Sequence, residues 1–132
     1  MIAIETNIVV RLLVADDPTQ TAQAAALVRD HPVLLLTSVL LETEWVLRSS
    51  YRVPRAAILE GLRRLVGLDQ VTLDQPAVVA QALDRFAAGV DLADALHLAA
   101  AGAASEFATF DRALARHAAA LGVSPAVRLC GG

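Results

Sequence analysis

The stretch IAIETNIVVRLLVA, residues 2–15, sets the pattern that the rest of the chain repeats. Apolar residues 2–4 predict a short buried strand, which stops at the polar trio Glu5, Thr6 and Asn7 before a segment with helical apolar spacing. We expect this first strand to be central in a sheet. A carboxylate at the end of such a strand is costly to bury without a cation or hydrogen-bond donors. Glu5 is therefore hard to explain as an ordinary structural residue.

Working outward, short apolar segments alternate with helical ones. Strands are predicted at residues 33–36, 71–73, 107–110 and 126–129, and helices at 19–31, 39–51, 54–68, 76–89, 91–104 and 112–122. Asp17 is expected to cap the second helix, with Pro18 at its first position, and Thr37 and Ser38 the third. Strands without polar alternation are covered on both faces, and strands separated by helices pair in parallel. The predicted fold is α/β, a three-layer α/β/α sandwich with a central, mostly parallel sheet in a single domain, 1–132.

Composition narrows the possible functions. The net charge of −3 gives no support for nucleic-acid binding, although an acidic total can hide a local basic rim. Aromatic residues make up only 4% of the chain, which argues against base stacking as the source of affinity. The single cysteine, Cys130, excludes a disulfide within the chain and fits a reducing cytosol. We find no signal peptide and no apolar run near the ~20 residues of a membrane span, so a cytoplasmic protein is expected.

Acidic residues recur just after predicted strands or at the start of the helices that follow them. In open α/β sheets the functional crevice lies at the carboxyl ends of the strands. Each acid also has a structural explanation: Asp91 suits a helix N-cap with Asp94 three residues on, and Asp111 suits the cap of the next helix. Glu44 is expected to face solvent. The acids expected at one edge are Glu5, Glu42, Asp91, Asp94 and Asp111.

Carboxylates brought close together repel one another and take up protons, unless a cation neutralises them. Mg²⁺ and Mn²⁺ prefer carboxylate and water oxygens as ligands. Such a cation binds phosphate oxygens and lowers the pKa of water. The pattern therefore predicts an Mg²⁺ or Mn²⁺ site that acts on a phosphate ester, without indicating which ester.

Four segments, in order, resemble the motif blocks of PIN-domain ribonucleases, most closely the VapC-type toxins of bacterial toxin–antitoxin pairs. They are IETN (4–7), LLETEWVLRSSY (40–51), DLADALHLAAA (91–101) and TFDRAL (109–114). The resemblance implies an Mg²⁺- or Mn²⁺-dependent endoribonuclease that hydrolyses RNA phosphodiesters with a metal-activated water. It implies catalytic roles for Glu5, Glu42, Asp94 and Asp111, metal ligation by Glu5, Asp94 and Asp111, and support from Thr6, Asn7, Asp91 and Thr109.

The same resemblance implies partners. They are an RNA substrate such as tRNA or rRNA and a VapB-type antitoxin that lays its C-terminal segment over the site. A toxin homodimer within that complex is also implied. Phosphotransfer receivers and haloacid-dehalogenase-like phosphatases also gather acids around Mg²⁺, but they rely on a lysine and this chain has none.

The chain departs from the family at its first acid, where ETN replaces the usual DTN. Glutamate displaces the carboxylate by about 1.5 Å, whereas catalytic groups tolerate about 0.5 Å. Three interpretations stay open: the site has adjusted, the enzyme is weak or specialised, or Glu5 was introduced to reduce toxicity. A rival hypothesis is a weakened PIN fold that binds RNA or an antitoxin without cutting.

Other side chains are ambiguous. Arg11 and Arg112 lie in helices that start beside acids and suit contacts with phosphate or with carboxylates. Arg48 and Arg52 belong to a group of arginines that forms either an ordinary solvated face or a rim for the RNA backbone. His97 is expected to be packed and hydrogen-bonded. Trp45 and Tyr51 are candidates for partner contacts.

Overall fold

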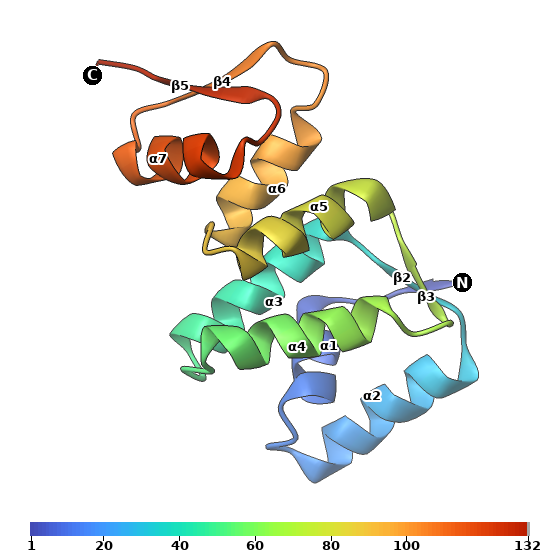
Figure 1. Ribbon diagram of the computed structural model, residues 1–132. Helices are drawn as coiled ribbons and strands as arrows, with labels where there is room; N and C mark the ends of the chain where they lie inside the picture. The colour runs from blue at the N-terminus through green and yellow to red at the C-terminus, as the bar shows by residue number, and fades with distance from the viewer. Residues whose placement is uncertain (132) are drawn as a thin grey trace. The chain divides into compact units, whose positions relative to one another are not determined.

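A computed structural model describes residues 1–131, and the chain divides into two units, Met1–Pro76 and Ala77–Gly132. Gly132, the last residue of the predicted single domain, lies outside the described residues. Each unit has its own parallel sheet (Figure 1). The single-domain organisation therefore stays a prediction.

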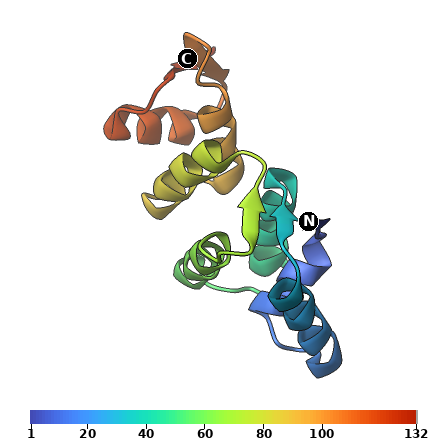
Figure 2. The same cartoon turned by 90° about the vertical axis from the view of Figure 1, so that its right-hand side faces the viewer.

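The first unit holds three strands and four helices. These are β1 (Ile2–Ala3), α1 (Thr6–Leu13), α2 (Pro18–Asp30), β2 (Val33–Leu35), α3 (Thr37–Ser49), α4 (Arg55–Val66) and β3 (Val71–Leu73). The strands are parallel and lie in the order β1-β2-β3, with Ile2 opposite Val33 and Leu35 opposite Leu73. Figure 2 shows β2 and β3 side by side.

Burial in this sheet differs from the prediction for its first strand. Val33 and Leu35 of β2 are fully buried, whereas Ile2 and Ala3 of β1 are exposed. The prediction of a buried first strand is thus wrong for Ile2 and Ala3. Within this three-stranded sheet β1 takes an end position beside β2, and its central position stays a prediction. Ile4, just after β1, is buried and donates its backbone N–H to Leu34.

Two of the predicted helix caps have different outcomes. Asp17 accepts the backbone N–H of Gln20 at 3.0 Å and Pro18 is the first residue of α2, as predicted. The predicted Thr37–Ser38 cap of α3 is wrong, because Thr37 already belongs to the helix. Its N–H and hydroxyl instead donate to Asp74, from the segment after β3, at 2.9 and 2.7 Å. The carboxylate of Asp74, which is distant in sequence, therefore accepts a backbone N–H group that the first turn of α3 leaves without a partner.

The second unit holds two strands and three helices, the first of which begins at Pro76, the last residue of the first unit. These are α5 (Pro76–Ala87), α6 (Leu92–Ala100), β4 (Glu106–Thr109), α7 (Arg112–Leu121) and β5 (Ala126–Leu129). The two strands are parallel, with Glu106 opposite Ala126 and Thr109 opposite Leu129. Helix α7 ends at Gly122 with φ 63°, the left-handed C-terminal conformation that glycine adopts without steric cost. The α/β class with parallel strands is therefore confirmed.

None of the helices within residues 1–131 combines the length and the apolar character that a membrane crossing requires.

Candidate active site

Glu5 and Thr6 lie where the chain leaves β1 and enters α1. Glu5 is the N-cap residue, is exposed, and makes no capping hydrogen bond with its side chain. Thr6 is buried, and its hydroxyl donates to Oε1 of Glu42 in α3. The start of α1 therefore fixes the Glu42 carboxylate and leaves the Glu5 carboxylate open to solvent.

Helix α3 places its two acids in different environments. Glu42 is exposed, whereas Glu44 is only 2% exposed. The prediction that Glu44 faces solvent is wrong, because residues two apart lie on different faces of a helix. Arg48, one turn on, donates Nε–H to Glu44 at 2.9 Å. This guanidinium therefore has a carboxylate partner, which limits it as an RNA contact.

Arg11 is the centre of a polar network at the end of α1. Its Nε donates to Gln20 at 2.7 Å, and its Nη1 lies 3.1 Å from Asp16 and 3.0 Å from the hydroxyl of Tyr51. Tyr51 in turn donates to Asp16 at 3.1 Å. The hydrogen bond with Tyr51 is the largest cause that raises the pKa of Arg11, followed among the raising causes by the charge of Asp16. The guanidinium of Arg11 in α1 is thus held in place and links α1 to Gln20 of α2.

A groove of about 480 Å³ lies beside Glu5 in the first unit. Its polar side chains carry one negative charge, one positive charge and three amides. The lining residues are Glu5, Asn7, Ile8, Arg11, Gln20, Gln23, Ala24 and Leu27.

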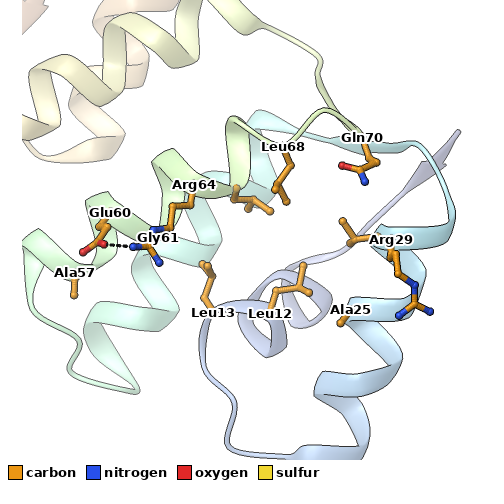
Figure 3. Close-up of a pocket in the computed structure, with 12 residues that line it drawn as sticks. Leu12, Leu13, Ala25, Arg29, Ala57, Glu60, Gly61, Arg64, Leu68 and Gln70 are labelled. Atoms are coloured by element: carbon orange, nitrogen blue, oxygen red, sulfur yellow. Dashed lines mark hydrogen bonds and ion pairs between the residues drawn. The ribbon is translucent and has the colours of Figure 1, made fainter.

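A second hollow of about 610 Å³ in the same unit is mainly apolar. Figure 3 shows Leu12 and Leu13 of α1 directed into the space between α1, α2 and α4, with Glu60 and Arg64 paired on α4 at 2.6 Å. Gly61 lies close to this leucine pair, since a Cβ at Gly61 would be 3.3 Å from Leu13. Leu68, after α4, contributes a 43% exposed side chain to the rim.

In the second unit, Asp91 and Asp111 cap successive helices. Asp91 accepts the backbone N–H of Asp94 at 3.3 Å, and Asp111 accepts that of Leu114 at 3.1 Å. Both predicted caps are confirmed. The hydroxyl of Thr109 accepts the N–H of Asp111 at 3.0 Å and so fixes the turn before α7. Each capping bond uses one carboxylate oxygen and leaves the other open to a further ligand.

The carboxylate of Asp94 feels the negative charges of both capping residues, Asp91 and Asp111. Its pKa is raised, first by burial and then by the negative charges of Asp91 and Asp111, while His97 acts in the opposite direction. His97 itself is exposed, so the prediction that it is packed is wrong. The second unit therefore contains three carboxylates close enough to oppose the ionisation of one of them.

Comparison with known families matches residues 2–120 to the PIN domain. The chain belongs to the PIN-domain family. No curated protein matches the chain. The match spans both units, and PIN domains are typically metal-dependent nucleases that bind RNA. The α/β architecture with parallel strands agrees with a PIN-like fold.

The donors of this PIN domain suit a hard divalent cation. Mg²⁺ is held in proteins by one or two carboxylates and keeps several waters. Asp91 and Asp111 each keep one carboxylate oxygen outside their capping bonds, and the half-buried carboxylate of Asp94 feels the charge of both. Among residues 1–131 no three or more Asp, Glu, His or Cys side chains gather as a complete metal cluster. Within each unit, a cation would therefore complete its shell with water.

Two aromatic side chains of the PIN domain are exposed, of which Trp45 was a candidate for partner contacts and Phe110 was missed. Phe110, immediately before Asp111, is 83% exposed, and Trp45 of α3 is 56% exposed. The argument from composition against base stacking as the source of affinity stays a prediction, although these two rings are accessible. Composition gives the number of aromatic residues but not their exposure. The position of Phe110 next to Asp111, an acid of the fourth motif, could have indicated an RNA contact from the sequence.

The remaining arginines named from the sequence are exposed. Arg112 is the first residue of α7, directly after Asp111. Arg52 follows α3 with φ 54°, an uncommon left-handed conformation for a residue other than glycine. Both side chains are accessible to a phosphate backbone.

Proposed function

We propose that this PIN domain is an Mg²⁺- or Mn²⁺-dependent endoribonuclease and the toxin of a type II toxin–antitoxin pair. The observation that carries the proposal is the group of Asp91, Asp94 and Asp111 at two helix starts. The pKa of Asp94 is raised there, first by burial and then by the negative charges of Asp91 and Asp111. Carboxylates that oppose one another's ionisation favour a cation. The order of the four acidic motifs along a PIN domain supports the same function.

The proposal assigns cation binding to Asp94 and Asp111, together with Glu5, and catalysis to these three and Glu42. When bound, the cation polarises the phosphate and lowers the pKa of water. Glu42 ligates a cation or orients the attacking water, and Thr6 holds its carboxylate by hydrogen bonding. Asn7, Asp91 and Thr109 are supporting residues.

In the proposed hydrolysis a water oxygen forms a bond to phosphorus, and one phosphoester bond to a sugar oxygen breaks. The water loses a proton and the departing oxygen gains one. We propose Arg112 and Arg52 as contacts to the RNA backbone, because both are exposed. Arg11 and Arg48 contribute less, since each already pairs with a carboxylate. tRNA and rRNA are the proposed substrates, and the cytoplasm is the proposed location.

The proposed protein partner is a VapB-type antitoxin, within a complex that contains a toxin homodimer. The mainly apolar hollow of about 610 Å³ between α1, α2 and α4 supports such a partner, because it suits the apolar face of an antitoxin segment. Its rim carries Arg29, Arg64 and Glu60, and polar rims are typical of protein interfaces.

A second candidate function is an RNA- or antitoxin-binding module without cleavage. Glu5 favours it, because its exposed carboxylate lies one methylene further from the backbone than that of the usual aspartate. This alternative predicts RNA binding that does not depend on a metal.

Controlled expression in bacteria tests the toxin function. Wild type should arrest growth and fragment cellular RNA, while Asp94→Asn should do neither at equal protein level. Growth that continues with intact RNA, in the presence of folded wild type, contradicts the proposal.

A further inference from the structure

The groove beside Glu5 is lined mainly by amide and apolar side chains, unlike the acidic group of Asp91, Asp94 and Asp111. It is formed between α1 and α2 in the first unit, and its volume of about 480 Å³ falls within the ~300–1,000 Å³ of ligand-binding clefts. Its amides are Asn7 on α1 and Gln20 and Gln23 on α2. Amides are neutral groups with paired donors and acceptors, which suit a neutral ligand that has both.

Arg11 orients one of these amides. Its Nε–H occupies Oε1 of Gln20, so Gln20 retains the two N–H donors of Nε2 for a ligand. The guanidinium is itself held by Asp16 and by the hydroxyl of Tyr51. Gln20 is therefore a pre-oriented donor, and pre-orientation lowers the entropy lost on binding.

The other two amides retain their full capacity. Asn7 and Gln23 are exposed, and within residues 1–131 neither side chain has a hydrogen-bond partner. Each can offer an N–H donor and a carbonyl acceptor to one ligand edge. Among the nucleobases, adenine presents a matching acceptor and donor at N7 and N6, to which asparagine and glutamine bind in a bidentate manner.

We propose that this groove binds an unpaired adenine of the RNA substrate, with Gln23 and Asn7 as its bidentate partners and Gln20 as a fixed donor. The proposal rests on the proposed function, and it makes these residues determinants of sequence specificity. Arg11 and Tyr51 act through Gln20 and are positioning residues.

The lining favours a base over a phosphate or a peptide. The one guanidinium in the groove is neutralised by Asp16, and Glu5 adds a negative charge, so the groove offers little attraction to phosphate. Its partly exposed apolar members, Ile8 and Leu27, supply contact area for a flat ring. Single-stranded RNA is recognised through unstacked bases that insert into such pockets.

Fluorescence anisotropy with four labelled RNA pentamers, UUAUU, UUCUU, UUGUU and UUUUU, tests the base preference. Measurements in EDTA separate binding from cleavage. Wild type should bind UUAUU about fivefold tighter or more than the other three. Gln23→Ala should abolish this preference, whereas Gln81→Ala, an exposed glutamine on α5, should keep it. Equal binding of all four pentamers, no binding, or a preference that survives Gln23→Ala overturns the proposal.

Tyr51→Phe tests the positioning step. It removes the hydroxyl that accepts from Arg11, so it should reduce the preference for UUAUU and leave the affinity for UUUUU unchanged. A parallel loss of affinity for both pentamers indicates general damage and contradicts the positioning role.

NMR maps the site directly, through the side-chain amide signals of Gln20, Gln23 and Asn7. AMP should shift these signals more than CMP, GMP or UMP. Signals that respond only to an antitoxin peptide overturn the base assignment. Base-selective binding without cleavage in Mg²⁺ contradicts the proposed nuclease but not this inference. Cleavage whose sites are unchanged in Gln23→Ala contradicts the inference but not the nuclease.

Discussion

The Thr6 hydroxyl at the first position of α1 donates to Oε1 of Glu42 in α3, across 36 positions of sequence. This bond joins the first two acidic motifs of the PIN domain, because Thr6 directly follows Glu5. It leaves Glu42 exposed but oriented. The second motif acid is therefore positioned from the first motif.

Replacing Thr6 tests this dependence. Thr6→Val keeps the shape and removes the donor, so RNA cleavage should slow about tenfold or more, the equivalent of a lost hydrogen bond to a charged group. Thr6→Ser keeps the donor and should retain most of the activity. Cleavage rates at matched protein concentration, with Tm as the folding control, measure the effect. Equal rates for Val and Ser variants would show that the bond is catalytically irrelevant.

Glu5→Asp is predicted to raise both stability and activity. Glu5 is the N-cap of α1 without a side-chain cap bond, and aspartate is among the best N-cap residues. We expect a gain of about 0.5–1 kcal/mol in the free energy of unfolding in EDTA. The shorter side chain also restores the family's carboxylate position, so cleavage in Mg²⁺ should accelerate. Slower cleavage by Glu5→Asp would mean that the site is adapted to glutamate.

Asp94 should give stability an unusual pH dependence in EDTA. Its folded pKa lies above the ordinary 3.8, first because of burial, so the folded state holds this proton more tightly than the unfolded state. The stabilising contribution is present below pH 3.8 and is lost as pH rises through the folded pKa. Asp94→Asn should therefore be more stable than wild type at pH 7, and the difference should shrink in acid.

Urea titrations at several pH values measure this difference. Glu106→Gln is a control of opposite sign in the same unit, since a hydrogen bond from Arg128 lowers the pKa of Glu106. Glu106→Gln removes this stabilised carboxylate, so it should lower the free energy of unfolding more at pH 7 than in acid. A pH-independent difference between wild type and Asp94→Asn would contradict the electrostatic description of the carboxylates.

If the antitoxin binds in the apolar hollow, a charge at the rim of the hollow should weaken its binding. Leu68→Asp introduces a charge at its rim and should weaken binding of the co-expressed antitoxin at least about tenfold, while RNA cleavage is retained. Leu121→Asp is a matched control, because Leu121 is 44% exposed, Leu68 is 43% exposed, and Leu121 does not line the hollow. Isothermal titration calorimetry measures both variants. Equal affinities would remove this hollow as the antitoxin surface.

Local features of the site could be predicted from the sequence. Asp17, Asp91 and Asp111 cap helices as expected, because an N-cap bond joins residues only two or three positions apart. The parallel strands also follow from apolar segments separated by helices.

Features that depend on distant residues could not be predicted. The start of α3 is satisfied by Asp74, which lies 37 positions away. Glu44 is buried although the neighbouring Glu42 is exposed, since the register of the helix against its surroundings decides which face is covered. The exposure of Phe110 likewise depends on what packs against β4, and composition carries no such information.

The most direct test of the central claim is cleavage of a mixed tRNA and rRNA pool by the purified, antitoxin-free protein. Wild type and Asp94→Asn are compared at equal concentration in Mg²⁺, in Mn²⁺ and in EDTA. We predict discrete fragments with wild type in either metal, none in EDTA, and at least a hundredfold slower cleavage by Asp94→Asn, about 2.7 kcal/mol of lost transition-state stabilisation. Intact RNA in every lane, or equal cleavage in EDTA, would contradict a metal-dependent ribonuclease.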